Sequence, residues 1–208
     1  MNVIAFPPRG DARAVLHSHD PEILRTIRSP GIAAAIWERK PLPGFLDWIG
    51  ALPARNLPRL RTLVPVGAVE PCVQAACDLA GIADGAFRDL LASDLAALSL
   101  IMAEVMASPM LHLRLQVITT NSCRRFHIDN MTARMLCTYR GRGTQLAQVG
   151  HESRPQQIST GSVTLLRGAR WPQESTRLLH RSPPIEGTGE TRLLAVIDPA
   201  SDYRGDGG

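Results

Sequence analysis

The sequence predicts an α+β protein in which helices from the N-terminal half support an antiparallel β-sandwich or barrel formed by the C-terminal half. Residues 84–107 carry apolar side chains at three- and four-residue spacing, which is the period of an amphipathic helix. From residue 111 onward, short alternating or apolar runs are separated by turns that contain glycine, a texture typical of β-strands. We therefore expect a long helix that packs on one face of the β structure.

The other helices are also expected in the first half of the chain. Ser29 and Pro30 precede an apolar run, an order that favours a helix N-cap and first turn, so residues 31–39 are predicted to form a short helix. Pro41 and Pro43 would end it. Further helices are expected over residues 45–51 and 71–80, whereas residues 59–66 are expected to be extended.

The strands are predicted mainly in the second half. Residues 111–117 alternate strictly between apolar and polar side chains. Further strands are expected over residues 134–139, 162–167, 177–180 and 192–198, and residues 124–129 are also expected to be extended.

The chain has 208 residues, of which 44% are hydrophobic, enough for one domain with a substantial core. We expect a single domain over 1–208 with a flexible arm (1–20), a mainly helical support (21–110), a β core with the functional site (111–200) and a flexible tail (201–208). Apolar runs are shorter than the roughly eighteen residues of a membrane span, and the N-terminus lacks signal-peptide features. The four cysteines are too few for a disulfide scaffold. A cytoplasmic protein without a membrane partner is the expectation.

Arginine dominates the basic residues. Lys40 is the only lysine, so 22 of the 23 basic residues are arginine, and the net charge is +4. Because a guanidinium binds carboxylate or phosphate through two parallel hydrogen bonds, the chain suits an anionic substrate or co-substrate, although solvated surface arginines would give the same count. The absence of a long basic run and an aromatic content of 4% argue against nucleic acid as a partner. Five arginines lie close to the motif described next: Arg124, Arg125, Arg134, Arg140 and Arg142.

The candidate site is a His-x-Asp motif, His127 and Asp129, followed much later by His180. In a strand, side chains at i and i+2 leave from the same face, so His127 and Asp129 would point to a common position. Two histidines and one carboxylate are the ligand set of non-heme Fe(II) enzymes, and they also bind zinc. We predict that His127, Asp129 and His180 bind a metal and are catalytic. The alternative is that they are ordinary core or surface residues.

The chain resembles a proteobacterial family known only as domain of unknown function 1826, through residues 126–129, 134–144 and 180–183. The same layout resembles the double-stranded β-helix, a jelly-roll or cupin-like fold, of iron and 2-oxoglutarate dioxygenases. That resemblance implies that His127, Asp129 and His180 are iron ligands and that Arg192 binds the distal carboxylate of 2-oxoglutarate. The sequence departs from the pattern at Leu194, where the superfamily often has Ser or Thr.

Other residues complete the predicted site. Thr138, Tyr139 and Arg134 are candidates for contacts to the co-substrate or another anion. Arg192 has a second interpretation, as a structural arginine paired with Asp198 or Glu190.

The resemblance implies an Fe(II)- and 2-oxoglutarate-dependent dioxygenase that hydroxylates an anionic small molecule or side chain. The alternative is a cupin-like zinc-binding protein that serves metal homeostasis, because members of the family tend to be encoded beside zinc-homeostasis genes. A cysteine ligand, Cys123 or Cys137, would favour zinc. A third hypothesis is an interaction protein with a degenerate site.

Overall fold

The computed structural model describes residues 10–200, and its main element is a seven-stranded sheet. Neighbouring strands are antiparallel except β2 and β3, which are parallel. In spatial order the strands are β2 (Ala14–Ser18), β3 (Ile32–Trp37), β9 (Val163–Arg167), β6 (Ala133–Arg140), β12 (Arg192–Pro199), β5 (Met110–Ile118) and β4 (Leu60–Pro65).

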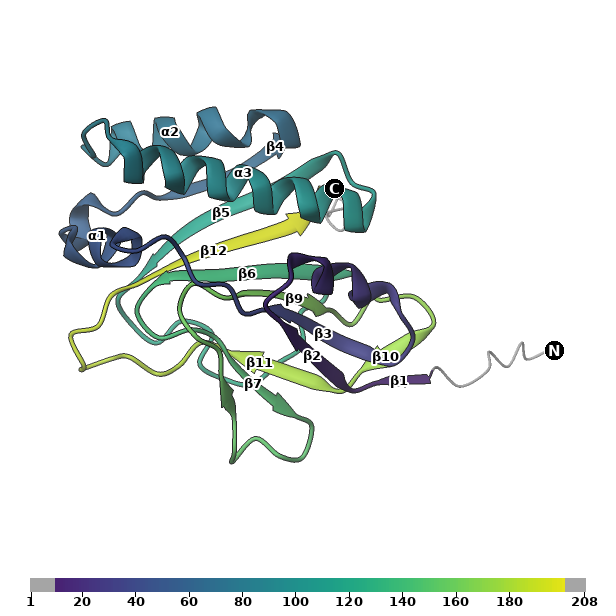
Figure 1. Ribbon diagram of the computed structural model, residues 1–208. Helices are drawn as coiled ribbons and strands as arrows, with labels where there is room; N and C mark the ends of the chain where they lie inside the picture. The colour runs from purple at the N-terminus through teal and green to yellow at the C-terminus, as the bar shows by residue number, and fades with distance from the viewer. Residues whose placement is uncertain (1–9, 201–208) are drawn as a thin grey trace, which may run out of the picture.

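A three-stranded antiparallel sheet forms a second layer, which lies across the large sheet from the helices (Figure 1). Its strands are β11 (Leu178–Arg181), β7 (Gln145–Gln148) and β8 (Gln156–Gln157). A short parallel pair joins β1 (Gly10–Ala12) to β10 (Glu174–Thr176).

The α-helices cover the other face of the large sheet (Figure 1). They are α1 (Phe45–Ala51), α2 (Val69–Leu79) and α3 (Ala86–Met106), with short 3-10 helices η1 (Pro21–Arg28), η2 (Ala54–Asn56) and η3 (Val66–Ala68). No helix within residues 10–200 is long and apolar enough to cross a membrane.

The large sheet is buried on both faces. On the helix side, Leu95 and Met102 of α3 belong to the same core cluster as Leu193 and Ile197 of β12. Facing the small sheet, a second cluster contains Val196 of β12 and Leu146 of β7. Strand β12 is buried along its whole length, because its odd positions pack on helices and its even positions face the second layer. The even face therefore carries the candidate site.

Most predicted elements are present. Helices α1, α2 and α3 occur where the apolar spacing predicts them, as do strands β4, β5, β6, β9, β11 and β12. The mixed class, with helices packed on a large and mainly antiparallel sheet, is confirmed.

The prediction of a helix over residues 31–39 is wrong. Gly31 has a φ of +78°, and the chain then enters β3, which pairs with β2 and β9. The apolar run Ile32–Trp37 is an interior strand, because four successive residues in it are buried and a short apolar run has no periodicity that distinguishes helix from strand. Ser29 caps the C-terminal end of η1 instead of starting a helix.

The predicted arm at residues 1–20 also differs. Residues 10–18 form β1 and β2, so this part of the chain belongs to the sheets, whereas residues 1–9 and the predicted tail, 201–208, lie outside the described residues. The large sheet takes β2, β3 and β4 from the N-terminal half, so the β structure is not restricted to residues 111–200. Strand β4 coincides with the extended segment expected over residues 59–66, whereas the sequence pattern missed β1, β2 and β3.

Candidate metal centre

The two histidines of the motif are placed opposite each other by a backbone bridge. His180 lies on β11, and the amide of each histidine donates to the carbonyl of the other, at 3.1 Å from His127 and 3.0 Å from His180. The two rings lie 4.4 Å apart between centroids. The predicted strand over residues 124–129 is absent, because this single bridge is followed by a turn in which the Asp129 carbonyl accepts from Ala169 instead of continuing along β11.

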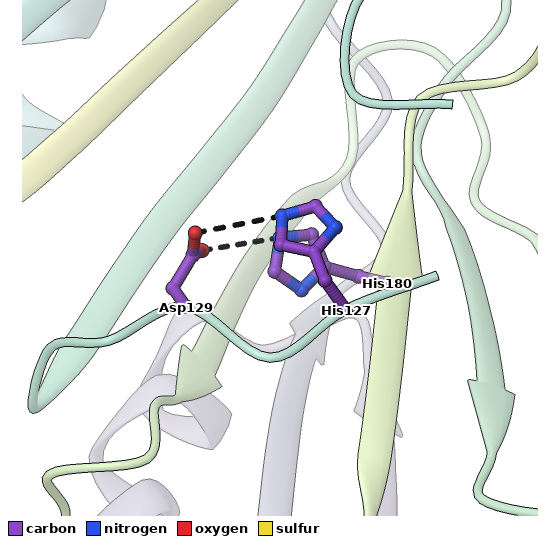
Figure 2. A group of neighbouring side chains, drawn as sticks. All are labelled: His127, Asp129 and His180. Carbon is purple, nitrogen blue, oxygen red and sulfur yellow. Dashed lines mark ion pairs between the residues drawn. The ribbon is translucent and has the colours of Figure 1, made fainter. Parts of the chain in front are cut away.

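Asp129 completes a compact group with both histidines (Figure 2). Its Oδ1 lies 3.6 Å from Nε2 of His127, and its Oδ2 lies 3.1 Å from Nε2 of His180. One ligand atom from each residue lies within 4.8 Å of the other two. The structure thus brings together the three residues predicted as ligands, although it does so without the predicted strand.

The hydrogen bonds around this group leave lone pairs directed at its centre. Nδ1 of His127 lies 2.9 Å from the carbonyl oxygen of Arg125, an acceptor, so the ring proton belongs on Nδ1 and Nε2 carries a lone pair. Oδ2 of Asp129 is buried and has no hydrogen-bond partner among the described residues. A divalent cation between these atoms would satisfy them, so the donor set fits Fe(II) or Zn²⁺.

Electrostatics keep the carboxylate ionised. Burial alone would raise the pKa of Asp129, but its contacts with His127 and His180 and the nearby charge of Arg134 outweigh burial and hold that pKa well below its usual range. The same contact with Asp129 holds the pKa of His127 above its ordinary value. The carboxylate is therefore available as an anionic ligand at any physiological pH.

Arg134 forms ion pairs with Asp129 and with a second carboxylate, Asp198. Its Nη1 lies 2.7 Å from Oδ1 of Asp129, while its Nε and Nη2 each donate to Asp198 at 2.8 Å. Asp198 is fully buried and also accepts from Nη2 of Arg114 at 2.6 Å. Arg134 was predicted to contact the co-substrate or another anion; in the structure it pairs with two carboxylates, Asp129 and Asp198, and lines a cavity beside the histidines.

Sequence reasoning missed Gly168, which lies beside the turn that carries Asp129. A Cβ on Gly168 would come within 2.0 Å of the Met131 carbonyl oxygen and 2.8 Å of the Asp129 carbonyl oxygen. The amide of Gly168 also donates to the Thr132 carbonyl at 2.8 Å. Only glycine allows the backbones to approach this closely. A glycine after a strand is too common to reveal this role from sequence.

Arg192 is a fully buried cation on the same face of the sheet. Its Nε donates to the Arg142 carbonyl at 2.6 Å, and its Nη1 donates to Oγ of Ser182 at 2.8 Å. Its Nη2 lies 3.5 Å from Oγ1 of Thr138. Burial lowers the pKa of Arg192 to about 10, an effect that the charge of Glu190 partly opposes.

The structural pairing considered for Arg192 is absent. Asp198 pairs with Arg114 and Arg134, and Glu190 pairs with Arg142. Among the ion pairs between residues 10 and 200, Arg192 takes part in none. Ser182, which sequence reasoning did not single out, gives the guanidinium the hydroxyl partner that Leu194 cannot provide.

Thr138 and Tyr139 separate to opposite faces of β6. Thr138 faces Arg192, whereas the hydroxyl of Tyr139 donates to Asp94 of α3 at 2.5 Å and its ring packs against Phe45. The prediction that Tyr139 contacts a co-substrate is therefore wrong, because alternation along the strand places it in the helix-side core. Cys137 lies on that side as well, and Nη2 of Arg39 donates to its sulfur.

A cavity of about 80 Å³ adjoins the two histidines and is lined by His127, His180, Ser182 and Leu194, among others. Cys123 lines the cavity too, but its sulfur lies outside the compact group of donor atoms that the described residues form. The structure therefore provides no cysteine ligand of the kind that would favour zinc.

Comparisons with solved structures agree with the fold. The dioxygenase for auxin oxidation 1 from Arabidopsis thaliana, solved as a complex with 2-oxoglutarate, aligns with a TM-score of 0.54 over 89% of this chain and 91% of its own, at 9% identity. The rice dioxygenase for auxin oxidation aligns with a TM-score of 0.47 over 89% of this chain and 82% of its own, at 13% identity. A Pseudomonas putida prolyl-4-hydroxylase aligns with a TM-score of 0.42 over 84% of this chain and 95% of its own, at 15% identity. At such identities the first of these shows a shared fold.

No curated protein matches the sequence. A family model does match, described as "Protein of unknown function (DUF1826)", and it covers residues 18–198. Because that match spans most of the chain, the protein belongs to the DUF1826 family.

Proposed function

We propose that this protein is a non-heme Fe(II)- and 2-oxoglutarate-dependent dioxygenase with a double-stranded β-helix core. The observation that carries the proposal is the convergence of His127, Asp129 and His180 beside a cavity, with Nε2 of His127 3.6 Å and Nε2 of His180 3.1 Å from the two carboxylate oxygens of Asp129. The large and small sheets lie on either side of this site, as in a jelly roll.

His127, Asp129 and His180 would hold the iron. When bound, Fe(II) with open coordination positions supplies the chemistry by which dioxygen and a 2-oxo acid oxidise a C–H bond. The Arg125 carbonyl orients the ring of His127, and the backbone bridge places the two histidines side by side. Arg134 holds the Asp129 carboxylate in place through an ion pair.

Arg192 would bind the distal carboxylate of 2-oxoglutarate. Its guanidinium lies among hydroxyl groups, with no carboxylate partner among the described residues, which is an incomplete environment for a buried cation. Ser182 links this arginine to the cavity, since it accepts from Arg192 and lines the same cavity as His180. Thr138 provides a second hydroxyl.

The competing function is zinc binding without oxygenase activity. The same three donors accept zinc, because catalytic zinc sites include sets of histidines and one carboxylate. Cys123 lies outside the donor group, so a zinc site that includes a cysteine is not supported among the described residues. The metal found on purification decides between iron and zinc.

The deciding experiment is anaerobic. Metal-free protein receives Fe(II) and then 2-oxoglutarate, and the weak visible charge-transfer band of a chelated 2-oxo acid is recorded. We expect the band in the wild type and in His151→Ala, a matched control on an exposed residue, but not in His180→Ala. His127→Ala and Asp129→Ala are each expected to reduce bound iron and abolish turnover of 2-oxoglutarate.

A band that persists in all three ligand variants would refute the site. The absence of a band in the wild type, together with zinc retained through purification, would favour the metal-homeostasis role instead.

A further inference from the structure

Arg114 has a buried hydrogen-bond donor that no group within residues 10–200 satisfies. It lies on β5, and its Nη2 donates to Asp198 at 2.6 Å. Its Nε is buried and has no partner among the described residues. Because buried donors are nearly always paired, this atom indicates a missing acceptor. The same side chain lines both the cavity at the metal centre and a larger hollow beside it.

A second cation lies directly opposite. Arg61, on the edge strand β4, is the register partner of Arg114 in the β4–β5 ladder. Like charges at directly opposed positions destabilise a sheet unless an anion lies between them. Arg61 is exposed and forms none of the ion pairs found within residues 10–200. Burial lowers the pKa of the neighbouring His112; the charge of Asp198 opposes this effect, and the positive charges of Arg114 and Arg61 add to it.

These two arginines line an open hollow of about 510 Å³ together with Arg59. The hollow and the cavity at the metal centre share Arg114, Gln116, Ile118 and Ser122, so the two spaces adjoin. A volume in this range accommodates a small molecule rather than a polymer.

The hollow is distinct from the position of Arg192. Arg114 lies opposite Val196 of β12, whereas Arg192 lies opposite Ile118. Four residues along a strand separate the two positions by roughly 13 Å. The two cationic groups on this sheet face are therefore too far apart to bind one small anionic group together.

We propose that Arg114 and Arg61, assisted by Arg59, form a binding subsite for an oxyanion, a carboxylate or a phosphate, carried by a small substrate whose remainder reaches the metal centre. The role in substrate selection rests on the function proposed above. The binding of the anion does not, because it requires neither iron nor 2-oxoglutarate.

The test uses the metal-free full-length chain and nuclear magnetic resonance of arginine side-chain Nε–H groups. The Arg114 signal is assigned by its disappearance in Arg114→Gln. Inorganic phosphate and, separately, acetate are then titrated at constant ionic strength in chloride. We expect a saturable shift of the Arg114 signal, and the probe that binds more tightly identifies the charged group of the substrate.

Arg61→Gln is the decisive variant, since Arg61 is exposed and its replacement leaves the Arg114–Asp198 pair intact. Loss of one charged hydrogen-bonding partner should lower the affinity for the anion by roughly tenfold. Arg13→Gln is the matched control, because Arg13 is an exposed arginine that precedes β2, at the opposite edge of the large sheet. It should leave the affinity unchanged.

The outcomes separate this proposal from the oxygenase. No saturable shift with either anion, or equal weakening by Arg61→Gln and Arg13→Gln, would overturn the subsite, even if the charge-transfer band forms. A shift that Arg61→Gln weakens and that persists in His180→Ala would support the subsite, even if the band fails to form.

Discussion

Replacement of Arg192 by methionine distinguishes a co-substrate ligand from a structural arginine. Without ligand, the change removes a buried charge whose pKa is lowered to about 10. Relative to the ordinary arginine value of 12.5, this corresponds to about 3 kcal/mol of unfavourable burial. The substitution also removes hydrogen bonds to Arg142, Ser182 and Thr138, a loss of similar size. We therefore expect the free energy of unfolding of the ligand-free protein to change by less than about 2 kcal/mol.

The effect on the liganded protein should be much larger. With 2-oxoglutarate at one hundred times its dissociation constant, the free energy of unfolding of the wild type increases by about 2.7 kcal/mol. In a domain of this size that raises the melting temperature by roughly 5–11 °C. The loss of two charge-assisted hydrogen bonds weakens the binding of 2-oxoglutarate by at least about 3 kcal/mol, or roughly a hundredfold in its dissociation constant. The same concentration then nearly equals the dissociation constant, and the gain falls to about 0.4 kcal/mol, or roughly 1–2 °C.

The assay is thermal unfolding of Fe(II)-loaded protein under anaerobic conditions, with and without 2-oxoglutarate. Arg177→Met serves as the control, because Arg177 is a half-exposed arginine paired with Asp11. An Arg192→Met protein that keeps the full ligand-dependent shift would refute the carboxylate role. One that loses many degrees without ligand would show that Arg192 is chiefly structural.

Four further predictions concern the candidate metal ligands and the residues around them. Gly168→Ala places a Cβ 2.0 Å from the Met131 carbonyl oxygen, so metal affinity measured against a chelator should fall at least about tenfold. Gly50→Ala is the control, because a Cβ at this position meets open space, and it should leave the metal affinity unchanged. Arg134→Met removes one of the arginines that pair with the buried Asp198, so urea unfolding should show a loss of about 3–5 kcal/mol; a loss below about 1 kcal/mol would contradict this. Protons compete with metal at His127, whose pKa is raised, so metal affinity should fall as pH drops through that pKa. In the metal-free protein the His127–Asp129 contact should stabilise the fold below the unfolded histidine pKa and lose this contribution as pH rises through the raised value, as pH-dependent melting would show.

The ligand residues could be predicted from sequence, but their geometry could not. A His-x-Asp pair and a distant histidine define a donor set by residue type alone, and the structure gathers those three side chains. The predicted reason was a strand over residues 124–129, whereas the actual cause is one backbone bridge to β11 and a turn held by Ala169. A pairing between segments this far apart in the chain leaves no local pattern.

The fold shows the same division between local and long-range information. Helix α3 and strand β5 were predictable because each has an amphipathic period. Strand β3 was not, since a buried strand between two neighbours has an unbroken apolar run that a helix could also have. The two faces of β6 explain the error at Tyr139: sequence places it beside Thr138, but a strand sends adjacent side chains in opposite directions.

The arginines on the site-bearing face of the large sheet illustrate what decides the role of a residue type. Arg134 is bound to carboxylates on two sides, so its donors are committed within the protein. Arg114 has one carboxylate and an unused Nε, and Arg192 has hydroxyl and carbonyl partners without a carboxylate. A buried guanidinium requires a carboxylate partner or an acceptor for each of its hydrogen-bond donors. An arginine with fewer carboxylate partners in the protein therefore has a greater need for an external anion. By this argument we propose that Arg134 orients Asp129, Arg192 binds the co-substrate and Arg114 binds the substrate. The resemblance to dioxygenases implies the role of Arg192 from the sequence, whereas the roles of Arg134 and Arg114 rest on their ion pairs in the structure.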